Sequence, residues 1–395
     1  MHKRITWLVC GNFNGYLDDG GTNSTLTLLR ELQKRGASCS VQVFLGLGSV
    51  ASLTAYVARV RDFAHSGRII IKKGYVSFYV KNILIEARIV KENIFKLYHT
   101  RDEKALRALT LHIKAILRMT RPDIIITSQE DIFSLRAADE SGIPCCHIFS
   151  SACFKFLDTF NIYKNEFRAC LAKTLVVTCS CFLKRDIRNI WNKRAILLPA
   201  LIDRISCVAK KRNPRYITFV NCHPHKGAVI FWNIARKLPH KRFLVIDNHG
   251  FFPLKSPLKN VTVLRRQSDM KKVYRLTKIL LFPSLVEESY GMVLVEAMAN
   301  GIPVIANRIE GIKNTLQKAG FLVDINQRDK DKKDYFYNSL YHMKTYQQYV
   351  ALITMLDSDS AVYNKASKKA LQEAERIMSR QRQALEGFAD LIAKR

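Results

Sequence analysis

Short apolar segments alternate with amphipathic ones along most of this chain of 395 residues. The segments ITWLVC (5–10), CSVQVFLG (39–46) and DIIIT (123–127) have the length and composition of buried β-strands. Between them, residues 25–36 and 101–119 repeat leucine and isoleucine at the spacing of an amphipathic helix. Strands that alternate with helices predict a parallel sheet covered on both faces, which is an α/β fold.

The alternation breaks between about residues 195 and 214 and then restarts. The strand segments of the second series include YITFVN (216–221), RFLVID (242–247) and KILLFP (278–283). A chain of this length suits two domains, at roughly 100–200 residues each. We therefore expect an N-terminal Rossmann-like domain over 1–200 and a C-terminal domain over 201–375, followed by a charged helical tail.

Composition limits the class of protein. The chain has 64 basic and 33 acidic residues, so its formal net charge is +31. Such a field attracts polyanions: nucleic acid, anionic lipid or phosphorylated substrates. No apolar run of 18 residues occurs, which argues against a spanning helix, and the apolar stretch Ile5–Cys10 is too short for a signal peptide. Ten cysteines without metal-ligand spacing are typical of reduced thiols in a cytoplasmic protein.

The stretch EESYGMVLVEAMANGIPVIA (287–306) holds two acids eight positions apart, Glu288 and Glu296. Ser289 is a typical N-cap, so we expect a helix to begin near Tyr290. The glycine of the following ANGIP suits a left-handed C-terminal cap, and its proline ends the helix. The unit is thus an acidic loop after a strand, a short helix, and another strand.

The start of this predicted helix is a potential phosphate site. Its unpaired N–H groups attract an anion, and Gly291 lets the anion approach the backbone. Glu288 precedes this point, and Glu296 lies roughly 9 Å along the axis, at ~1.5 Å per residue. The two carboxylates would flank the diphosphate of a nucleotide sugar and accept hydrogen bonds from its sugar and its ribose. The alternative is a solvated loop acid and an exposed helical acid, although the apolar neighbours of Glu296 favour a pocket.

The region from about 261 to 324 resembles the donor-binding half of retaining nucleotide-sugar glycosyltransferases of family four. Their E-x7-E motif corresponds to Glu288 and Glu296, and the surrounding FPS, YG and VEAMANGIPVIA match it too. The resemblance implies the GT-B fold, in which two Rossmann-like parallel-sheet domains face each other across a cleft. It also implies that Glu288 contacts the transferred sugar and that Glu296 contacts the ribose. The backbone amides that it places against the diphosphate are those of Gly291, Met292 and Val293.

Upstream, FVNCHPHKG (219–227) is predicted to be a strand-to-helix loop. The resemblance implies that Lys226 contacts the diphosphate from this loop. The family often has an arginine near the start of the loop, where this chain has Asn221 or Cys222. We expect Asn221 to lie in the nucleotide site, with less positive charge than the family usually provides.

Two further groups of polar residues are candidates near this loop. Arg265 or Arg266 could replace the missing arginine, or could simply lie on the surface. His223 and His225 are spaced like a pair of metal ligands, but the sequence offers no third ligand, so we interpret them as residues that shape the loop.

The N-terminal half carries weaker motifs. Gly20 and Gly21, between a strand and a helix, resemble the family's glycine-rich loop, which approaches the donor phosphate and the acceptor; a simple turn is the alternative. The family often has a histidine near the reaction centre at a place that falls near Ser150 and Ser151. His147 is interpreted as a core residue.

The resemblance implies a retaining, hexosyltransferase-type glycosyltransferase. The expected donor is a UDP- or GDP-sugar, and the expected acceptor is a glycan or a lipid-linked glycan of cell-envelope or polysaccharide biosynthesis. The resemblance implies that residues 376–395 cross back to the first domain and that no cofactor or metal is needed. Asp357-Ser358-Asp359 is interpreted as a helix cap. The alternatives are another GT-B enzyme, such as an epimerase or a phosphorylase, and a non-catalytic partner subunit; nucleic-acid binding is disfavoured because no RNA or DNA module is recognisable.

Residues 67–96 mix basic and aromatic side chains and contain only two acids. One interpretation is a peripheral contact with the inner face of an anionic membrane, worth roughly 1 kcal/mol for each basic residue near the surface. The other is a buried strand or helix whose lysines form a solvated face. The sequence leaves both interpretations open.

Overall fold

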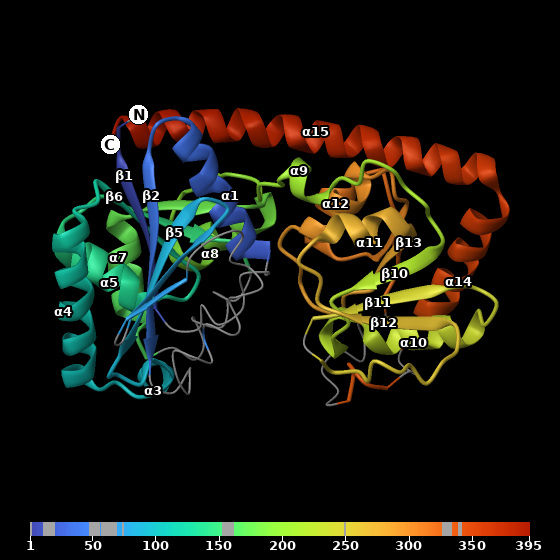
Figure 1. Cartoon of the computed structure of the whole chain (residues 1–395), viewed down its shortest axis with the longest axis horizontal. Helices are drawn as coiled ribbons and strands as arrows, with labels where there is room; N and C mark the ends of the chain where they lie inside the picture. Colours follow the sequence, from blue (N-terminus) through green and yellow to red (C-terminus); the bar gives the residue numbers. More distant parts are fainter. Residues whose placement is uncertain are drawn as a thin grey trace. The chain divides into compact units, whose positions relative to one another are not determined.

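The computed structural model describes residues 2–10, 20–46, 56, 69–72, 75–151, 162–248, 250–325, 334–338 and 342–395. The chain separates into two compact units. Unit 1 comprises the residues up to Leu201 together with Gln381–Arg395, and unit 2 comprises Ile202–Arg380. Each unit is a sheet with helices packed on it, so the predicted α/β class is confirmed (Figure 1).

Within the described residues, unit 1 contains a nine-stranded sheet of order β3-β4-β5-β2-β1-β6-β7-β8-β9. Its strands are β1 Arg4–Cys10, β2 Ser38–Gly46, β3 Ile70–Lys72, β4 Tyr75–Val80, β5 Ile83–Val90, β6 Ile124–Ser128, β7 Cys145–Phe149, β8 Leu175–Thr178 and β9 Ala195–Leu197. The pairs from β5 to β9 are parallel. The three strands predicted first along the chain are confirmed as β1, β2 and β6, within one residue at each end.

Helices cover both faces of this sheet, as Figure 1 shows. On one face, α1 (Gly20–Lys34) buries its leucines in a core with Trp7 and with the end of the last helix of the chain. On the other face, α4 (Glu103–Thr120) places His112 edge-on to Phe44. Further helices in the described part of unit 1 are α3 Ile94–His99, α5 Ile132–Ser141, α7 Lys164–Lys173 and α8 Cys181–Trp191.

The prediction of a parallel sheet is wrong at one edge of unit 1, where β3, β4 and β5 pair antiparallel. Lys81 and Asn82 connect β4 to β5 with φ of 50° and 66°. Two left-handed residues form a tight turn that reverses the chain, whereas parallel pairing needs a long crossover. The side chains of this hairpin that alternate into the core are Val76, Phe78, Val80, Ile83 and Ile85. Within residues 67–96, the buried-strand interpretation is therefore correct for these side chains.

Within the described residues, unit 2 contains a six-stranded parallel sheet of order β12-β11-β10-β13-β14-β15. Its strands are β10 Tyr216–Val220, β11 Phe243–Asp247, β12 Val261–Arg265, β13 Thr277–Phe282, β14 Val304–Asn307 and β15 Phe321–Val323. Its helices are α9 Arg204–Cys207, the 3-10 turn η1 Pro224–Lys226, α10 Ala228–Lys237, α11 Met270–Leu276, α12 Met292–Ala299, α13 Glu310–Leu316, α14 Met343–Ser358 and α15 Ser360–Ala393. One apolar core lies on the α10 and α14 side of the sheet and another on the α11, α12 and α13 side.

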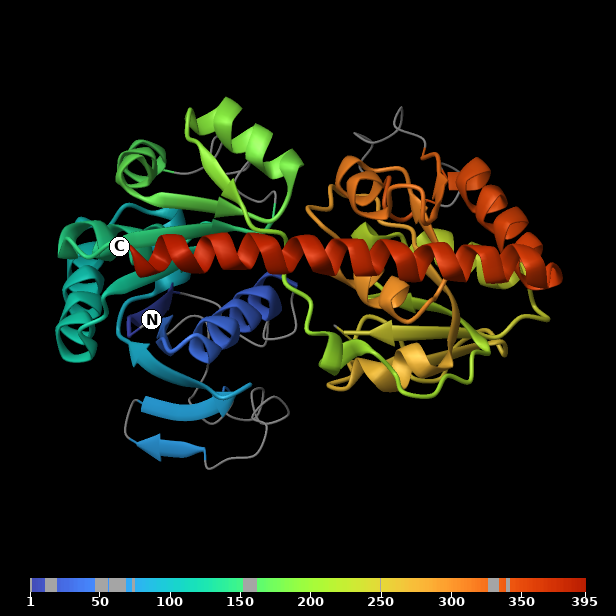
Figure 2. The same ribbon diagram turned by 90° about the horizontal axis from the view of Figure 1, so that it is seen from above.

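Helix α15 contributes to both units, and Figure 2 shows its uninterrupted course. Its earlier turns bury Ala370 and Ala374 in unit 2. Its last turns bury Leu385, Phe388 and Ile392 in the core of unit 1. None of the described helices combines the length and the apolar character that crossing a membrane requires.

Candidate active site

The sheet of unit 2 changes its direction of growth between β10 and β13. From β10 the chain adds β11 and β12 on one side, and then crosses back to place β13, β14 and β15 on the other. Loops that leave two adjacent carboxyl ends at such a switch point diverge and leave room for a ligand. Lys226 follows β10 and Glu288 follows β13, so both predicted residues lie at this edge of the sheet.

Lys226 and Glu288 form an ion pair through Nζ and Oε1. The Glu288 side chain is only 12% exposed, and that of Lys226 is 30% exposed. The hydroxyl of Ser284, which is buried, donates to the same oxygen of Glu288 over 2.7 Å. A charged pair with a hydroxyl donor on the shared carboxylate is held in place, because charge-assisted hydrogen bonds are stronger than neutral ones. The ammonium keeps one side open to solvent or to a second anion.

Two glycines allow the loops of this site to approach each other. A Cβ on Gly227, which has φ of 85°, would lie 2.0 Å from the carbonyl oxygen of Pro283. A Cβ on Gly311, at the start of α13, would lie 1.6 Å from the carbonyl oxygen of Glu288. Leu285 N also donates to His225 O over 2.9 Å, which ties the loop after β13 to the loop after β10. Any side chain at either glycine would force the loops apart.

The N-cap of α12 differs from the prediction. The helix begins at Met292, and its N-cap is Gly291, with φ of 74° and ψ of 63°, rather than Ser289. A residue with Cβ rarely adopts this left-handed conformation, and glycine adopts it without strain. Ser289 is buried in the preceding loop. The predicted amides of residues 291–293 therefore belong to the cap and first turn of the helix, where N–H groups are free of intrahelical partners.

Glu296 lies on the second turn of α12 and is half-buried. The hydroxyl of Tyr274, a fully buried residue of α11, donates to Glu296 Oε2 over 2.6 Å. Burial and the neighbouring Glu296 raise the pKa of Tyr274 well above its ordinary value, so this hydroxyl stays protonated and serves as a donor. Glu296 is thus held by its own neighbour, separately from the Lys226–Glu288 pair.

Asn221 stands at the carboxyl end of β10 with φ of 62°. Its Oδ1 is buried and has no hydrogen-bond partner among the described residues. Leaving a buried acceptor unpaired costs free energy. The loop after β10 therefore presents an amide that a ligand donor or a water molecule would stabilise.

Arg265 is already occupied by a partner. It pairs with Asp247 Oδ2 at 2.7 Å and donates to Phe252 O at the same distance. Asp247 is fully buried at the end of β11 and also accepts the backbone N–H groups of Gly250 and Phe252, each over 2.9 Å. The pair therefore orders the loop after β11. The sequence analysis did not predict a role for Asp247. Its position at the end of a buried strand is the feature that could have indicated one.

His223 and His225 shape their loop in the way the sequence predicts. His223 is the N-cap residue of η1, and its Nδ1 accepts the backbone N–H of His225 over 3.1 Å. The rings also pack on aromatic neighbours: His223 lies 4.8 Å from Phe251 and His225 lies 4.1 Å from Phe336, between ring centroids. Both histidines thus contribute to the position of Lys226, which follows directly.

In unit 1, Gly20 and Gly21 are the first two residues of α1 and not a loop. The hydroxyls of Ser150 and Ser151, after β7, both lie against the amide of Gln129, after β6. His147 is fully buried, with Nδ1 2.8 Å from Thr127 Oγ1 and Nε2 2.9 Å from Gln129 O, so its prediction as a core residue is confirmed.

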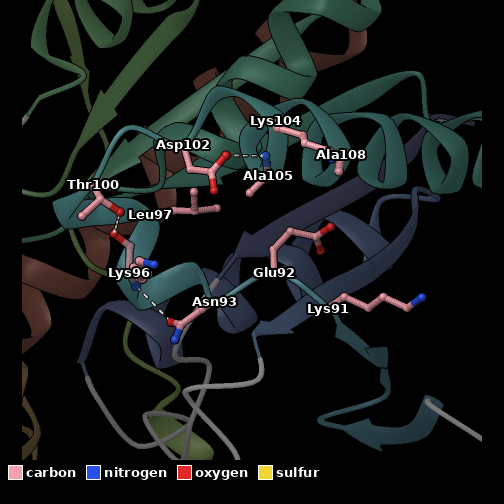
Figure 3. A pocket seen from close by; sticks show the side chains of 10 residues that line it. All are labelled: Lys91, Glu92, Asn93, Lys96, Leu97, Thr100, Asp102, Lys104, Ala105 and Ala108. Carbon is pink, nitrogen blue, oxygen red and sulfur yellow. Dashed lines mark hydrogen bonds between the residues drawn. The ribbon is translucent and has the colours of Figure 1, made fainter.

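A cavity of about 400 Å³ also lies in unit 1 (Figure 3). Its lining residues are Lys91, Glu92, Asn93, Lys96, Leu97, Thr100, Asp102, Lys104, Ala105 and Ala108. Asn93 and Asp102 on its wall are the N-caps of α3 and α4. The cavity shares no residue with the site around Lys226, and its charged side chains are mostly exposed.

Residues 254–352 match the family model described as glycosyl transferases group 1. Two curated proteins are similar over short regions. N-acetyl-alpha-D-glucosaminyl L-malate synthase of Bacillus anthracis is 30% identical over 103 residues, which are 24% of this chain and 27% of that protein. D-inositol 3-phosphate glycosyltransferase of Corynebacterium kroppenstedtii is 40% identical over 70 residues, 17% of this chain and 15% of that protein. The chain thus covers about a quarter or less of either relative.

Solved structures resemble nearly the whole chain at low identity. A glycosyltransferase from Rickettsia africae has a TM-score of 0.66 and 15% identity, covering 99% of this chain and 98% of its own. Anabaena HepE in complex with UDP-glucose has a TM-score of 0.67 and 13% identity, covering 98% and 100%. These likenesses establish the GT-B fold, with two Rossmann-like units. Within it, the segment that matches group 1 glycosyl transferases includes Glu288 and Glu296.

Proposed function

We propose that this chain is a retaining glycosyltransferase that moves a hexosyl group from a nucleotide sugar to an acceptor hydroxyl. The observation that carries the proposal is the Lys226–Glu288 pair at the switch point of unit 2. Glu288 lies inside the segment that matches group 1 glycosyl transferases, and Lys226 reaches it from the loop after β10. A partly exposed ammonium beside a carboxylate that is 12% exposed suits a substrate that brings both a phosphate and a sugar hydroxyl.

The reaction requires stabilisation of the diphosphate that leaves and of the positive charge that develops on the sugar. Lys226 and the N–H groups at the start of α12 stabilise the first, because they are fixed donors at the place of the developing anion. Glu288 accepts a hydroxyl of the transferred sugar. Glu296, held by Tyr274, accepts the ribose hydroxyls.

UDP-sugars are the first donors to test, because HepE, a structure with the same fold, is bound to UDP-glucose; GDP-sugars are the second. The acceptor that we propose is a glycan or a lipid-linked glycan in envelope or polysaccharide synthesis at the cytoplasmic face of a membrane. We propose no metal requirement, so activity should survive EDTA. Loss of activity in EDTA that magnesium restores would contradict this point.

The donor site is tested with paired variants. We expect Glu296→Gln to weaken binding of the sugar-free nucleoside diphosphate, and Glu288→Gln to lower turnover while leaving that binding near the parent value. Glu287→Gln is the matched control, since this acid is exposed in the same loop. Calorimetry and initial rates with UDP-, GDP- and ADP-sugars make the measurement. Release of a free modified sugar, with no transfer, would favour an epimerase instead.

A peripheral membrane contact of unit 1 is part of the proposal. The antiparallel edge exposes Ile70, Ile71 and Tyr79 beside Lys72, a mixture that suits an interface with anionic lipid. Arg68 and Lys73 of the same stretch lie outside the described residues. Binding to phosphatidylglycerol vesicles should fall with salt and with charge reversal at Lys72. Binding that is absent at low salt, or indifferent to the reversal, would contradict the membrane contact.

A further inference from the structure

The loop that carries Glu288 is fixed from behind by a buried residue. Asn307, the last residue of β14, is fully buried, and its Nδ2 donates to the carbonyl oxygen of Ser284 over 2.8 Å. The same Ser284 donates its hydroxyl to Glu288 Oε1. Asn307 therefore fixes the backbone of the residue whose side chain holds the candidate catalytic acid.

Asn307 is itself oriented from α14. The hydroxyl of Tyr349, which is fully buried, donates to Asn307 Oδ1 over 3.0 Å. The amide of Asn307 has one orientation, because the flipped amide would place its oxygen against the carbonyl oxygen of Ser284, with two acceptors and no proton between them. Water does not reach either group, so a lost bond is not replaced by solvent.

We propose that Asn307 and Tyr349 are positioning residues for Glu288, acting through Ser284. The inference rests on the proposed function, which makes Glu288 the group that contacts the sugar. Their loss would let the loop after β13 shift, and a displacement of about an ångström at reacting groups costs on the order of 100-fold in rate. Glu296 is held by Tyr274 instead, so nucleotide binding should be spared.

The test compares variants that each remove one hydroxyl or amide. Tyr349→Phe keeps the buried ring, and we expect kcat to fall about tenfold; Asn307→Ala, which removes both bonds, should lower it about 100-fold. Tyr363→Phe is the matched control, because its hydroxyl donates to Lys278 O over 3.0 Å elsewhere in unit 2. The Kd for the sugar-free nucleoside diphosphate should stay within about twofold of the parent in all three.

A fourth variant, Tyr274→Phe, supplies the opposite pattern. It removes the donor to Glu296, so we expect weaker binding of the nucleoside diphosphate with kcat near the parent at saturating donor. A general loss of stability would lower kcat and binding alike and would not separate the two tyrosines. Equal kcat and Kd changes in Tyr349→Phe and Tyr274→Phe would overturn the positioning role.

Hydrogen exchange of the ligand-free protein separates this inference from the proposed function. Peptides covering residues 284–291 should exchange faster in Tyr349→Phe than in Tyr363→Phe, whether or not a donor is known. Unchanged exchange together with parent-like kcat would overturn the inference. Faster exchange in a protein that turns over no UDP-, GDP- or ADP-sugar would support the positioning contact and overturn the transferase proposal.

Discussion

At the residue scale, the charge of Lys226 is the most direct contribution to the proposed chemistry. Its ammonium is paired with Glu288 and remains 30% exposed. We expect Lys226→Ala to lower kcat by about 100-fold or more, because removing one donor from an oxyanion site costs a few kcal/mol of barrier. Steady-state kinetics with the best donor measure the effect, and Lys237→Ala, an exposed lysine at the end of α10, is the control. Near-parent activity would move the role to Arg266, since Arg265 is paired with Asp247.

His147 provides a prediction about pH and stability. Burial lowers the pKa of His147 to about 3, from an ordinary value of 6.5. The unfolded chain therefore takes up this proton first as the pH falls, so the stabilisation is present above pH 6.5 and is lost progressively toward pH 3. The loss is at most about 1.4 kcal/mol per pH unit. Burial raises the pKa of Asp131 in the same unit to about 6, with an opposite effect that cancels in a comparison of variants.

The measurement is urea unfolding at several pH values between about 4 and 8. His147→Leu should flatten the dependence on pH relative to the parent, even if the variant is less stable at pH 8. His112→Gln, at an exposed histidine of α4, is the matched control. The same slope in the parent and in His147→Leu would contradict the prediction.

At the scale of elements, the loop after β13 depends on the close approach of α13. We expect Gly311→Ala to lower stability by about 1–3 kcal/mol and to abolish most of the activity, because the new methyl group would meet the carbonyl oxygen of Glu288. Gly387→Ala should have the opposite sign: no atom lies within 4 Å of its Cβ position, and an alanine in an exposed helix interior is favoured by about 1 kcal/mol. Chemical denaturation measures the free energy of unfolding of both variants and of the parent. A Gly311→Ala protein as stable and active as the parent would contradict the prediction, because the loop after β13 would then have moved to accommodate the methyl group at no cost.

At the scale of the whole molecule, the end of α15 belongs to the core of unit 1. Phe388 is 2% exposed there, beside Leu385 and Ile392. We expect Phe388→Ala to destabilise unit 1 by about 3–5 kcal/mol, through lost burial and a cavity. Hydrogen exchange in β1 and α1 peptides reports on that unit alone. Arg382→Ala, at an exposed position of the same helix, is the control, and equal exchange in both variants would contradict the packing.

Most elements were predictable because their signals are local. The helix expected over 101–119 is α4, Glu103–Thr120, and the strands of both sheets follow runs of apolar residues. The N-cap of α12 was not predictable in this way. Ser289 has the spacing of an N-cap, and the left-handed backbone that makes Gly291 the actual cap depends on the surrounding loop. The hairpin of β4 and β5 was hidden for a similar reason, since Lys81 and Asn82 carry no glycine to mark the turn.

The sequence by itself determined the α/β class and the segment that holds Glu288, Glu296 and Lys226. Periodicity, caps and motif spacing act over a few neighbours and can be read directly. Only the tertiary structure decided what lies behind those side chains: Asn307 contacts Ser284 across 23 positions, and Tyr349 contacts Asn307 across 42. Such contacts form where the sheet brings distant strand ends together, and a buried polar group takes whichever partner the packing provides, because leaving it unpaired costs more than pairing gains.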